Sequence, residues 1–188
     1  QKYISNIFRI DPVYLQNTPT NRRKTKRLHT RYNTTMKHRL SKLGCILAHE
    51  KALKKIKKLK TNNNLILEQD AQLTRTLIKP PKYSCYMGGW IIPPQISKSG
   101  DPVSIPNLKK GLQKIIYDKF QVLMAHSYFL KTHQEATQLL QSMKIKSIKT
   151  YDVHLMNTHL LSYFYYPPLF VQGKHVSDID AKVNKNDQ

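Results

Sequence analysis

The chain has 188 residues, enough for one compact domain and a tail, and its 32 Lys and Arg against 11 Asp and Glu give a net charge of +21. No window approaches the roughly 18 consecutive apolar residues of a transmembrane helix. Two cysteines without a CxxC pair argue against a disulfide framework and favour a reducing compartment.

The positive charge is concentrated in the first third of the chain. Residues 1–60 carry 17 basic and 2 acidic side chains, whereas residues 61–188 carry 15 and 9. Between residues 21 and 60 the only acid is Glu50. The basic side chains of this region repel one another, so we expect the region to bind a polyanion. Nucleic acid is the first candidate and an anionic membrane surface the second.

Residues 1–36 are predicted to form an extended basic arm. Residues 1–20 contain scattered apolar side chains and two X-Pro bonds, and we expect them to lie against a neighbouring molecule. Residues 17–36 nearly lack apolar side chains, so burial cannot offset their ordering entropy. This segment is expected to be disordered in the free protein and ordered on its partner. The chain begins at Gln1 rather than Met, which suggests a processed or trimmed N-terminus.

A basic helical hairpin is predicted over residues 37–80. Its first helix, residues 37–60, has apolar residues at helical spacing, with Gly44 as a weak point. They are Leu40, Leu43, Leu47, Leu53, Ile56 and Leu59. Asparagines 62–64 signal a turn, and residues 65–78 are expected to form a second, shorter helix.

An irregular, Pro- and Gly-rich connection is expected over residues 81–103, with a short strand or a packed loop at 83–92. The body over residues 104–172 is predicted to open with a helix from Ser104 to about Leu130. A capping box at Thr132 and Glu135 begins another helix, and strand pieces are expected within residues 145–156. Residues 173–188 form a polar tail. The predicted fold class is α+β, mainly helical, with a long basic N-terminal extension.

The predicted RNA contacts are the cations of the arm and first helix, with one aromatic residue that either stacks on a base or packs on the helix below. They are Arg22, Arg23, Lys24, Lys26, Arg27, His29, Arg31, Tyr32, Lys37, His38, Arg39, Lys42, Lys54, Lys55, Lys57 and Lys58. The chain has no GxxG loop, no RNP aromatic motif and no Cys/His finger spacing. Contacts with the nucleic-acid backbone and shape are therefore expected, rather than base readout.

The sequence offers only weak signals for a metal site or a catalytic site. Cys45 and His49 lie four residues apart on a predicted helix, a workable ligand spacing that Cys85 could complete. A structural Cys and His is the favoured reading, so no metal or cofactor is expected. The acids are dispersed and no P-loop, GxSxG or HExxH motif occurs, which predicts a non-enzyme without a small-molecule substrate. The aromatic run at residues 163–166 is expected to be core or a protein interface.

A Lys-rich thread over residues 21–39, leading into a basic helix that ends at Lys60, precedes a small mixed body. In this arrangement the chain resembles organellar ribosomal proteins as a class. The resemblance implies a structural constituent of a mitochondrial ribosome in the matrix, bound to ribosomal RNA and to neighbouring ribosomal proteins, without membrane insertion. The 25 Lys against 7 Arg, with 11 Asn, hint at an AT-biased genome, as in many organelles.

Two alternatives remain open from the sequence. One is a DNA-compacting protein of a nucleoid or a virus, which would bind duplex DNA as well as RNA. The other is an accessory subunit of a respiratory membrane complex, with its basic arm on a cardiolipin-rich membrane surface.

Overall fold

The computed structural model describes residues 6–10, 13–26, 35–75, 79–92, 108–123, 125–143 and 150–173. Four helices and ten strands account for 36% and 27% of these described residues. The helices are α1 (Pro19–Thr25), α2 (Met36–Leu59), α3 (His133–Ser142) and α4 (Tyr151–Asn157). The strands are β1 (Asn6–Ile10), β2 (Asn64–Glu68), β3 (Ala71–Leu73), β4 (Cys85–Tyr86), β5 (Trp90–Ile92), β6 (Gly111–Lys114), β7 (Gln121–Leu123), β8 (Ser127–Leu130), β9 (Tyr163–Tyr166) and β10 (Phe170–Gln172).

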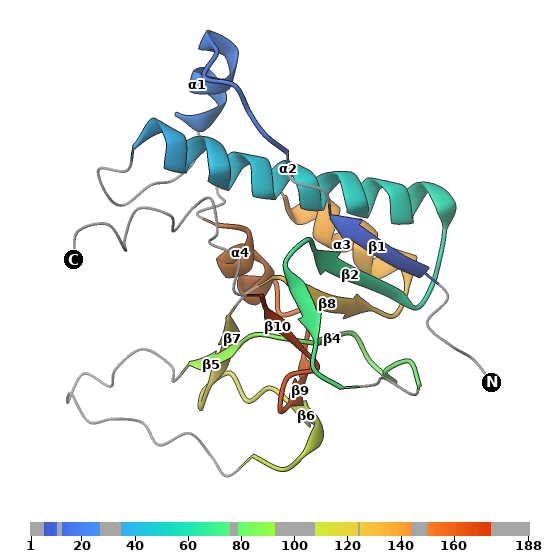
Figure 1. Cartoon of the computed structure of the whole chain (residues 1–188). Helices are drawn as coiled ribbons and strands as arrows, with labels where there is room; N and C mark the ends of the chain where they lie inside the picture. Colours follow the sequence, from blue (N-terminus) through green and yellow to red (C-terminus); the bar gives the residue numbers. More distant parts are fainter. Residues whose placement is uncertain are drawn as a thin grey trace, which may run out of the picture.

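A six-stranded mixed sheet, in the order β1-β2-β8-β4-β9-β6, forms the centre of the molecule (Figure 1). β1 pairs with β2 and β4 pairs with β9 in parallel, and the other three pairs are antiparallel. Parallel neighbours cannot be joined by a tight turn, so each parallel pair needs a long connection. The first connection contains α1 and α2, and the second contains α3 and α4.

Alternate residues of the central strands enter two apolar clusters, because successive side chains of a strand point to opposite faces. Ile66 and its partner Tyr128 belong to the larger cluster, which includes most of the buried apolar residues of α2 and α3. Leu65 and its partner Phe129 belong to a smaller cluster with residues of β4 and β10. Helix α2 contacts α3 and β1, and α3 contacts β8. The sheet therefore lies between a helical layer and a small layer that includes β10 (Figure 1).

The expected helix over residues 37–60 is confirmed as α2, and its glycine has a packing role. A Cβ at Gly44 would collide with the carbonyl oxygen of Val13. Val13 and Leu15 pack against the larger cluster, so the segment that follows β1 crosses α2 at this point. The glycine that weakens the helix by propensity is therefore what allows this close approach.

Replacing Gly44 with alanine is expected to lower the free energy of unfolding by about 1 to 3 kcal/mol, because the new methyl group overpacks this crossing. Helix propensity alone predicts the opposite sign, a gain of about 1 kcal/mol. Urea denaturation followed by circular dichroism measures the difference. An increase in stability would show that the Val13 segment does not rest on the helix.

The capping box predicted at Thr132 and Glu135 is confirmed at the start of α3. The Thr132 hydroxyl accepts from the backbone N–H of Glu135, and the Glu135 carboxylate accepts from the backbone N–H of Thr132 at 2.8 Å. Ser84, beside β4, also donates to this carboxylate at 2.7 Å. The cap therefore ties α3 to the sheet as well as to its own first turn.

The prediction of a second helix in the hairpin is wrong. Residues 64–68 and 71–73 form β2 and β3, and residues 76–78 lie outside the described part of the chain. β2 lies between β1 and β8, and its first three residues are buried. A continuous apolar run of this kind is typical of a central strand, and its periodicity does not distinguish it from a buried helix.

The predicted helix from Ser104 to about Leu130 is wrong as well. Residues 104–107 lie outside the described residues, and the rest contains β6, β7 and β8. Gly111 has a φ of +112°, which no helix interior adopts, and Tyr128 and Phe129 are residue types that favour strands.

The strand pieces expected within residues 145–156 are contradicted by α4, and residues 144–149 are not described. With strands over 27% of the described residues and helices over 36%, the mainly helical fold class is wrong.

The described parts of the predicted arm differ from an extended thread. Residues 6–10 form β1, paired with β2 of the same chain, and residues 19–25 form α1. Of the two alternatives for residues 83–92, a short strand or a packed loop, the structure shows strands, β4 and β5. Residues 27–34, 93–107 and 174–188, which include most of the predicted tail, lie outside the described residues.

Candidate nucleic-acid interface and a buried Cys-His-Glu cluster

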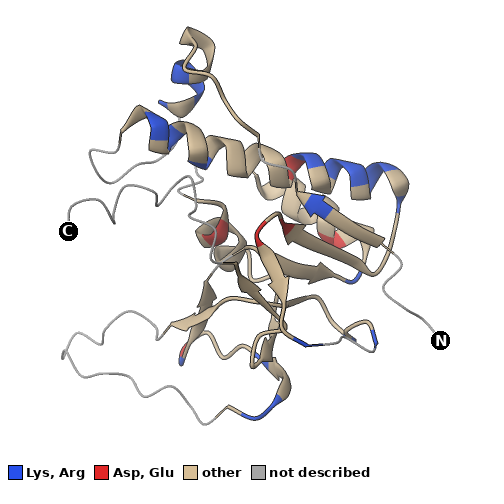
Figure 2. Cartoon of the chain, viewed as in Figure 1, with Lys and Arg blue, Asp and Glu red and all other residues tan. Residues whose placement is uncertain are grey.

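Four exposed lysines form a stripe on the C-terminal half of α2. Ala52, Leu53 and Ile56 of the same helical turns are buried in the core. Residues at spacings of three, four and seven share one side of a helix, and here that side is opposite to the buried one. The α2 lysine stripe consists of Lys51, Lys54, Lys55 and Lys58. Figure 2 shows this charge along the C-terminal half of α2.

Little negative charge compensates the stripe. Lys54 pairs with Glu50 at 2.6 Å, one turn earlier, yet its side chain remains 63% exposed. Exposed pairs of this kind contribute about 0.5 kcal/mol or less. The ammonium of Lys55 lies 5.9 Å from the ring centroid of Phe8, and Lys51 and Lys58 form no ion pair with a described residue. The stripe is therefore free to bind an external anion.

A second basic group lies on α1, which packs against α2. Thr18 caps α1 by accepting from the backbone N–H of Asn21, and Thr25 buries its side chain against Met36 of α2. The α1 cations, all exposed, are Arg22, Arg23, Lys24 and Lys26. Figure 2 shows α1 on the outer side of α2, near its N-terminal half and away from the sheet, so the stripe and the α1 cations both lie on the helical side of the molecule.

The other predicted RNA-contact residues differ in their exposure. Lys37 is exposed at the start of α2, and Lys42 is half-buried. Lys57 is exposed but lies beside the stripe, since neighbouring helical residues are separated by about 100°. His38 and Arg39 are half-buried and engaged in interactions within the chain. Arg27, His29, Arg31 and Tyr32 lie outside the described residues. Lys51 lies in the basic region of the sequence but was not among the predicted RNA contacts. The structure places it in the stripe.

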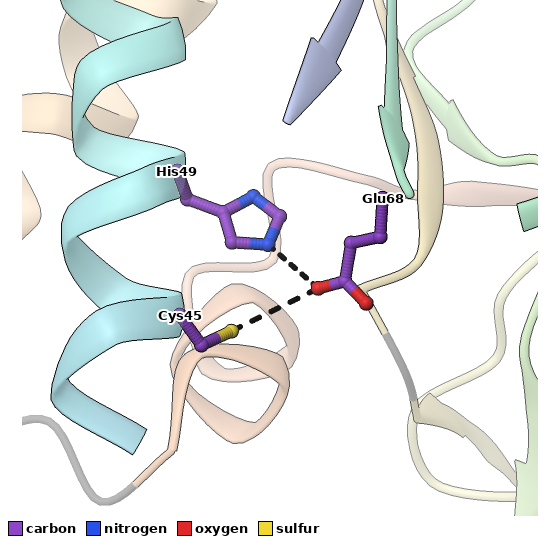
Figure 3. Close-up of side chains that lie close together, drawn as sticks. All are labelled: Cys45, His49 and Glu68. Carbon is purple, nitrogen blue, oxygen red and sulfur yellow. Dashed lines mark hydrogen bonds and ion pairs between the residues drawn. The ribbon is translucent and has the colours of Figure 1, made fainter. Parts of the chain in front are cut away.

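Beneath the basic layer, three polar side chains converge from α2 and β2 (Figure 3). Cys45 and His49 project from one side of α2 toward Glu68 at the end of β2. His49 Nε2 lies 2.9 Å from Glu68 Oε1, and Cys45 Sγ lies 3.8 Å from the same oxygen. The three potential ligand atoms lie within 4.8 Å of one another. His49 is fully buried, whereas the side chain of Glu68 is 26% exposed.

Two buried tyrosines hold the far side of the His49 ring. The Tyr128 hydroxyl lies 3.1 Å from Nδ1 of His49 and 2.8 Å from the Tyr151 hydroxyl. The rings of His49 and Tyr151 stack with centroids 3.7 Å apart and planes 12° apart. When Nε2 carries the proton, His49 donates to Glu68 and accepts from Tyr128. Both ring nitrogens are thereby satisfied, as a buried polar group requires.

The surroundings shift the pKa values of this cluster in opposite directions. Burial, reinforced by the charges of Glu68, Asp152 and Asp70, raises the pKa of the Cys45 thiol well above its ordinary value. Burial alone would also raise the pKa of Glu68. The hydrogen bond and charge of His49, with smaller contributions from His126 and Cys45, outweigh it, so the pKa of Glu68 is lowered. At neutral pH the cluster thus holds a protonated thiol beside an ionised carboxylate.

The cluster is not arranged for thiol catalysis. A nucleophilic cysteine needs a histidine base within hydrogen-bond reach, oriented by a third group. Here the thiol donates to Glu68 instead, and both ring nitrogens of His49 are occupied by Glu68 and Tyr128. Burial also keeps Cys45 in the unreactive thiol form. The arrangement suits a structural hydrogen-bond network or a metal site.

Sequence reasoning found two members of this cluster and missed the others. The four-residue spacing of Cys45 and His49 placed both on one helical side, but Cys85, the suggested third ligand, is buried in the smaller apolar cluster. Glu68 takes that place. The sequence signal for Glu68 was its position as the single acidic residue at the end of an apolar run. This position points to the cluster only when residues 64–68 are known to form a central strand.

The aromatic run at residues 163–166 forms β9 within the central sheet. Phe164 is buried, and the tyrosines on either side are half-buried. Tyr163 stacks on Tyr83 with centroids 4.3 Å apart. These contacts place the run in the core of this chain.

Comparison with known proteins identifies no relative: no family model, no curated protein and no solved structure matches the chain. Within the described residues, no helix has both the length and the apolar character needed to cross a bilayer. The function is therefore inferred from the surfaces and side chains of the chain itself.

Proposed function

We propose that this chain is a structural, non-enzymatic RNA-binding protein of a mitochondrial ribosome, which binds ribosomal RNA through the α2 lysine stripe and the α1 cations. The observation that carries the proposal is the exposure of these cations on the helical side of the sheet. Among the described residues, the stripe forms a single ion pair, between Lys54 and Glu50. The mixed sheet beneath positions this layer and packs on neighbouring ribosomal proteins.

The mechanism is electrostatic. Ammonium and guanidinium groups neutralise phosphates, and the release of condensed counterions drives binding. Because the stripe lies on a helix anchored by its buried face, its lysines keep a fixed spacing of one or two helical turns along the RNA backbone. Such contacts position RNA strands without reading bases. They allow two phosphate backbones to approach one another across the helix.

The mitochondrial ribosomal assignment rests on the composition of the chain and on its resemblance to that class. A lysine-rich first third with one acid between residues 21 and 60 is typical of proteins placed among closely packed phosphates. A nucleoid protein or a membrane-associated subunit would use the same cations on a different polyanion. Direct binding measurements separate these three partners.

The full chain is expected to bind structured RNA with a steep dependence on salt. Eight contacts, from the stripe and the α1 cations, predict a slope of log K against log[salt] of roughly −6 to −7. Fluorescence anisotropy with folded RNA, duplex DNA of equal length and anionic vesicles measures this slope for each partner. Tighter binding to RNA than to duplex DNA supports the proposal. Equal binding to DNA, or a preference for vesicles, would contradict it.

A further inference from the structure

We propose that Cys45, His49 and Glu68 form a zinc site in which a water molecule takes the fourth position. This site goes beyond the proposed function, because it concerns a buried cluster that does not belong to the basic surface. It can be tested on the free chain without RNA.

The separations of the three donors already approach those of a tetrahedral metal site. Zinc lies about 2.0 to 2.3 Å from N, O and S ligands, so ligand atoms around one ion are about 3.3 to 3.7 Å apart. His49 Nε2 and Glu68 Oε1 are 2.9 Å apart, Cys45 Sγ and Glu68 Oε1 are 3.8 Å apart, and no pair exceeds 4.8 Å. Small side-chain rotations suffice to admit the ion.

The rigid parts of the fold hold these donors in place. Cys45 and His49 are fixed one turn apart on α2, whose core-facing residues are buried. Glu68 lies at the end of β2, which pairs with both β1 and β8. Cys45 and Glu68 are partly exposed, so a solvent molecule can complete the coordination. A site with three protein ligands and an open fourth position follows from this arrangement.

The tyrosine pair supplies the outer partner that a metal-bound histidine needs. Ligation through Nε2 leaves the ring proton of His49 on Nδ1, which then donates to the Tyr128 hydroxyl at 3.1 Å. Tyr128 can accept that proton and donate to Tyr151 at 2.8 Å, since either hydroxyl of this pair can be the donor. The same hydrogen bonds thus support both the apo and the metal-bound tautomer.

The charge around the site favours a soft or borderline dication. A thiolate, an imidazole and one carboxylate match zinc rather than magnesium or calcium, which prefer oxygen ligands. Asp70 and Asp152 add negative charge near Cys45. One oxygen of Asp70, Oδ1, is buried without a hydrogen-bond partner among the described residues. A dication beside Glu68 offsets this accumulation of negative charge.

Binding releases the proton of the Cys45 thiol. This proton passes to solvent as the S–Zn bond forms, Glu68 binds as the carboxylate, and His49 binds through Nε2 with its ring proton on Nδ1. The bound ion, one thiolate and one carboxylate sum to zero charge. Because the thiol must ionise, affinity for zinc is expected to rise with pH.

The test is titration of the full chain, first stripped with a chelator, with zinc by calorimetry in two buffers of different ionisation enthalpy. One zinc per chain and release of at least the thiol proton are expected. Cobalt(II) is the spectroscopic probe, since a thiolate–cobalt charge-transfer band reports coordination by cysteine.

The two cysteines of the chain provide a matched pair of variants. Cys45→Ser should abolish the cobalt charge-transfer band and weaken zinc binding at least 100-fold, since even outer partners contribute about 10- to 100-fold. Cys85→Ser, in the smaller cluster, should leave both unchanged. Glu68→Gln provides a second variant at the site, and circular dichroism checks that each variant is folded.

Saturable binding of one zinc, lost in Cys45→Ser and retained in Cys85→Ser, supports the site. Absence of zinc binding by the folded wild-type chain would overturn it and leave a purely structural network. Unchanged zinc affinity in folded Cys45→Ser and Glu68→Gln would also overturn it, by placing the ion elsewhere.

Discussion

Replacing the four stripe lysines with glutamine is expected to weaken RNA binding on the order of 1,000-fold at about 0.1 M salt. Each phosphate contact contributes roughly 0.7 to 0.9 to the salt slope, and so about five- to eightfold in affinity at this salt concentration. Loss of all four contacts should therefore reduce the slope by about 3. Anisotropy titrations across a salt series measure both quantities on the same protein.

A matched control removes four exposed lysines elsewhere. Lys109, Lys110, Lys114 and Lys119 are exposed around β6, far in sequence from the stripe, and their replacement by glutamine changes the net charge equally. If the α2 stripe is the interface, this control should change affinity by less than about tenfold. Equal losses in the two variants would show that net charge drives binding and that no defined surface exists.

Replacing His49 with alanine is expected to lower the free energy of unfolding by about 3 to 5 kcal/mol. The substitution opens a cavity beneath α2 and removes the hydrogen-bond partner of the Glu68 carboxylate and of the buried Tyr128 hydroxyl. Urea denaturation in the presence of a chelator measures the apo network alone. His133→Ala, at the start of α3, removes a half-buried histidine whose Nδ1 lies 3.4 Å from Asn62 Oδ1, and should cost less than about 1 kcal/mol. A similar cost for the two variants would contradict a special role of the cluster.

The same network predicts how the free energy of unfolding changes at acidic pH. The pKa of Glu68 in the folded chain lies below its ordinary value of 4.5, so the unfolded chain binds its proton more readily. Its contribution to stability is fully present above about pH 4.5 and is lost as the pH falls through the pKa of the folded state. Glu68→Gln should therefore flatten the loss of stability below pH 4.5. If this variant loses stability below pH 4.5 as steeply as the wild-type chain, other carboxyl groups dominate the acid dependence of stability.

Local patterns in the sequence predicted some elements well. Apolar residues at helical spacing between Leu40 and Leu59 identified α2, and a Thr-Glu pair at the spacing of a capping box identified the start of α3. Both signals are contained within a few turns of chain. For the same reason the pairing of Cys45 with His49 and the exposure of the stripe were accessible from the sequence.

Long-range pairing explains what the sequence did not predict. β1 and β2 are parallel neighbours separated by α1 and α2, and β4 and β9 are separated by about 75 residues. No local pattern reports such contacts, and a strand buried on both faces, such as β8, shows no alternation. Its apolar run was therefore taken for a helix. Glu68 and Tyr128 join His49 only through this pairing, so the buried cluster emerged from the fold.

The proposed function is tested most directly by following this chain through a sucrose gradient of a mitochondrial lysate, with and without ribonuclease. Our proposal predicts co-migration with one ribosomal subunit and loss of that position after ribonuclease treatment. Migration with a membrane complex, unaffected by ribonuclease, would contradict it.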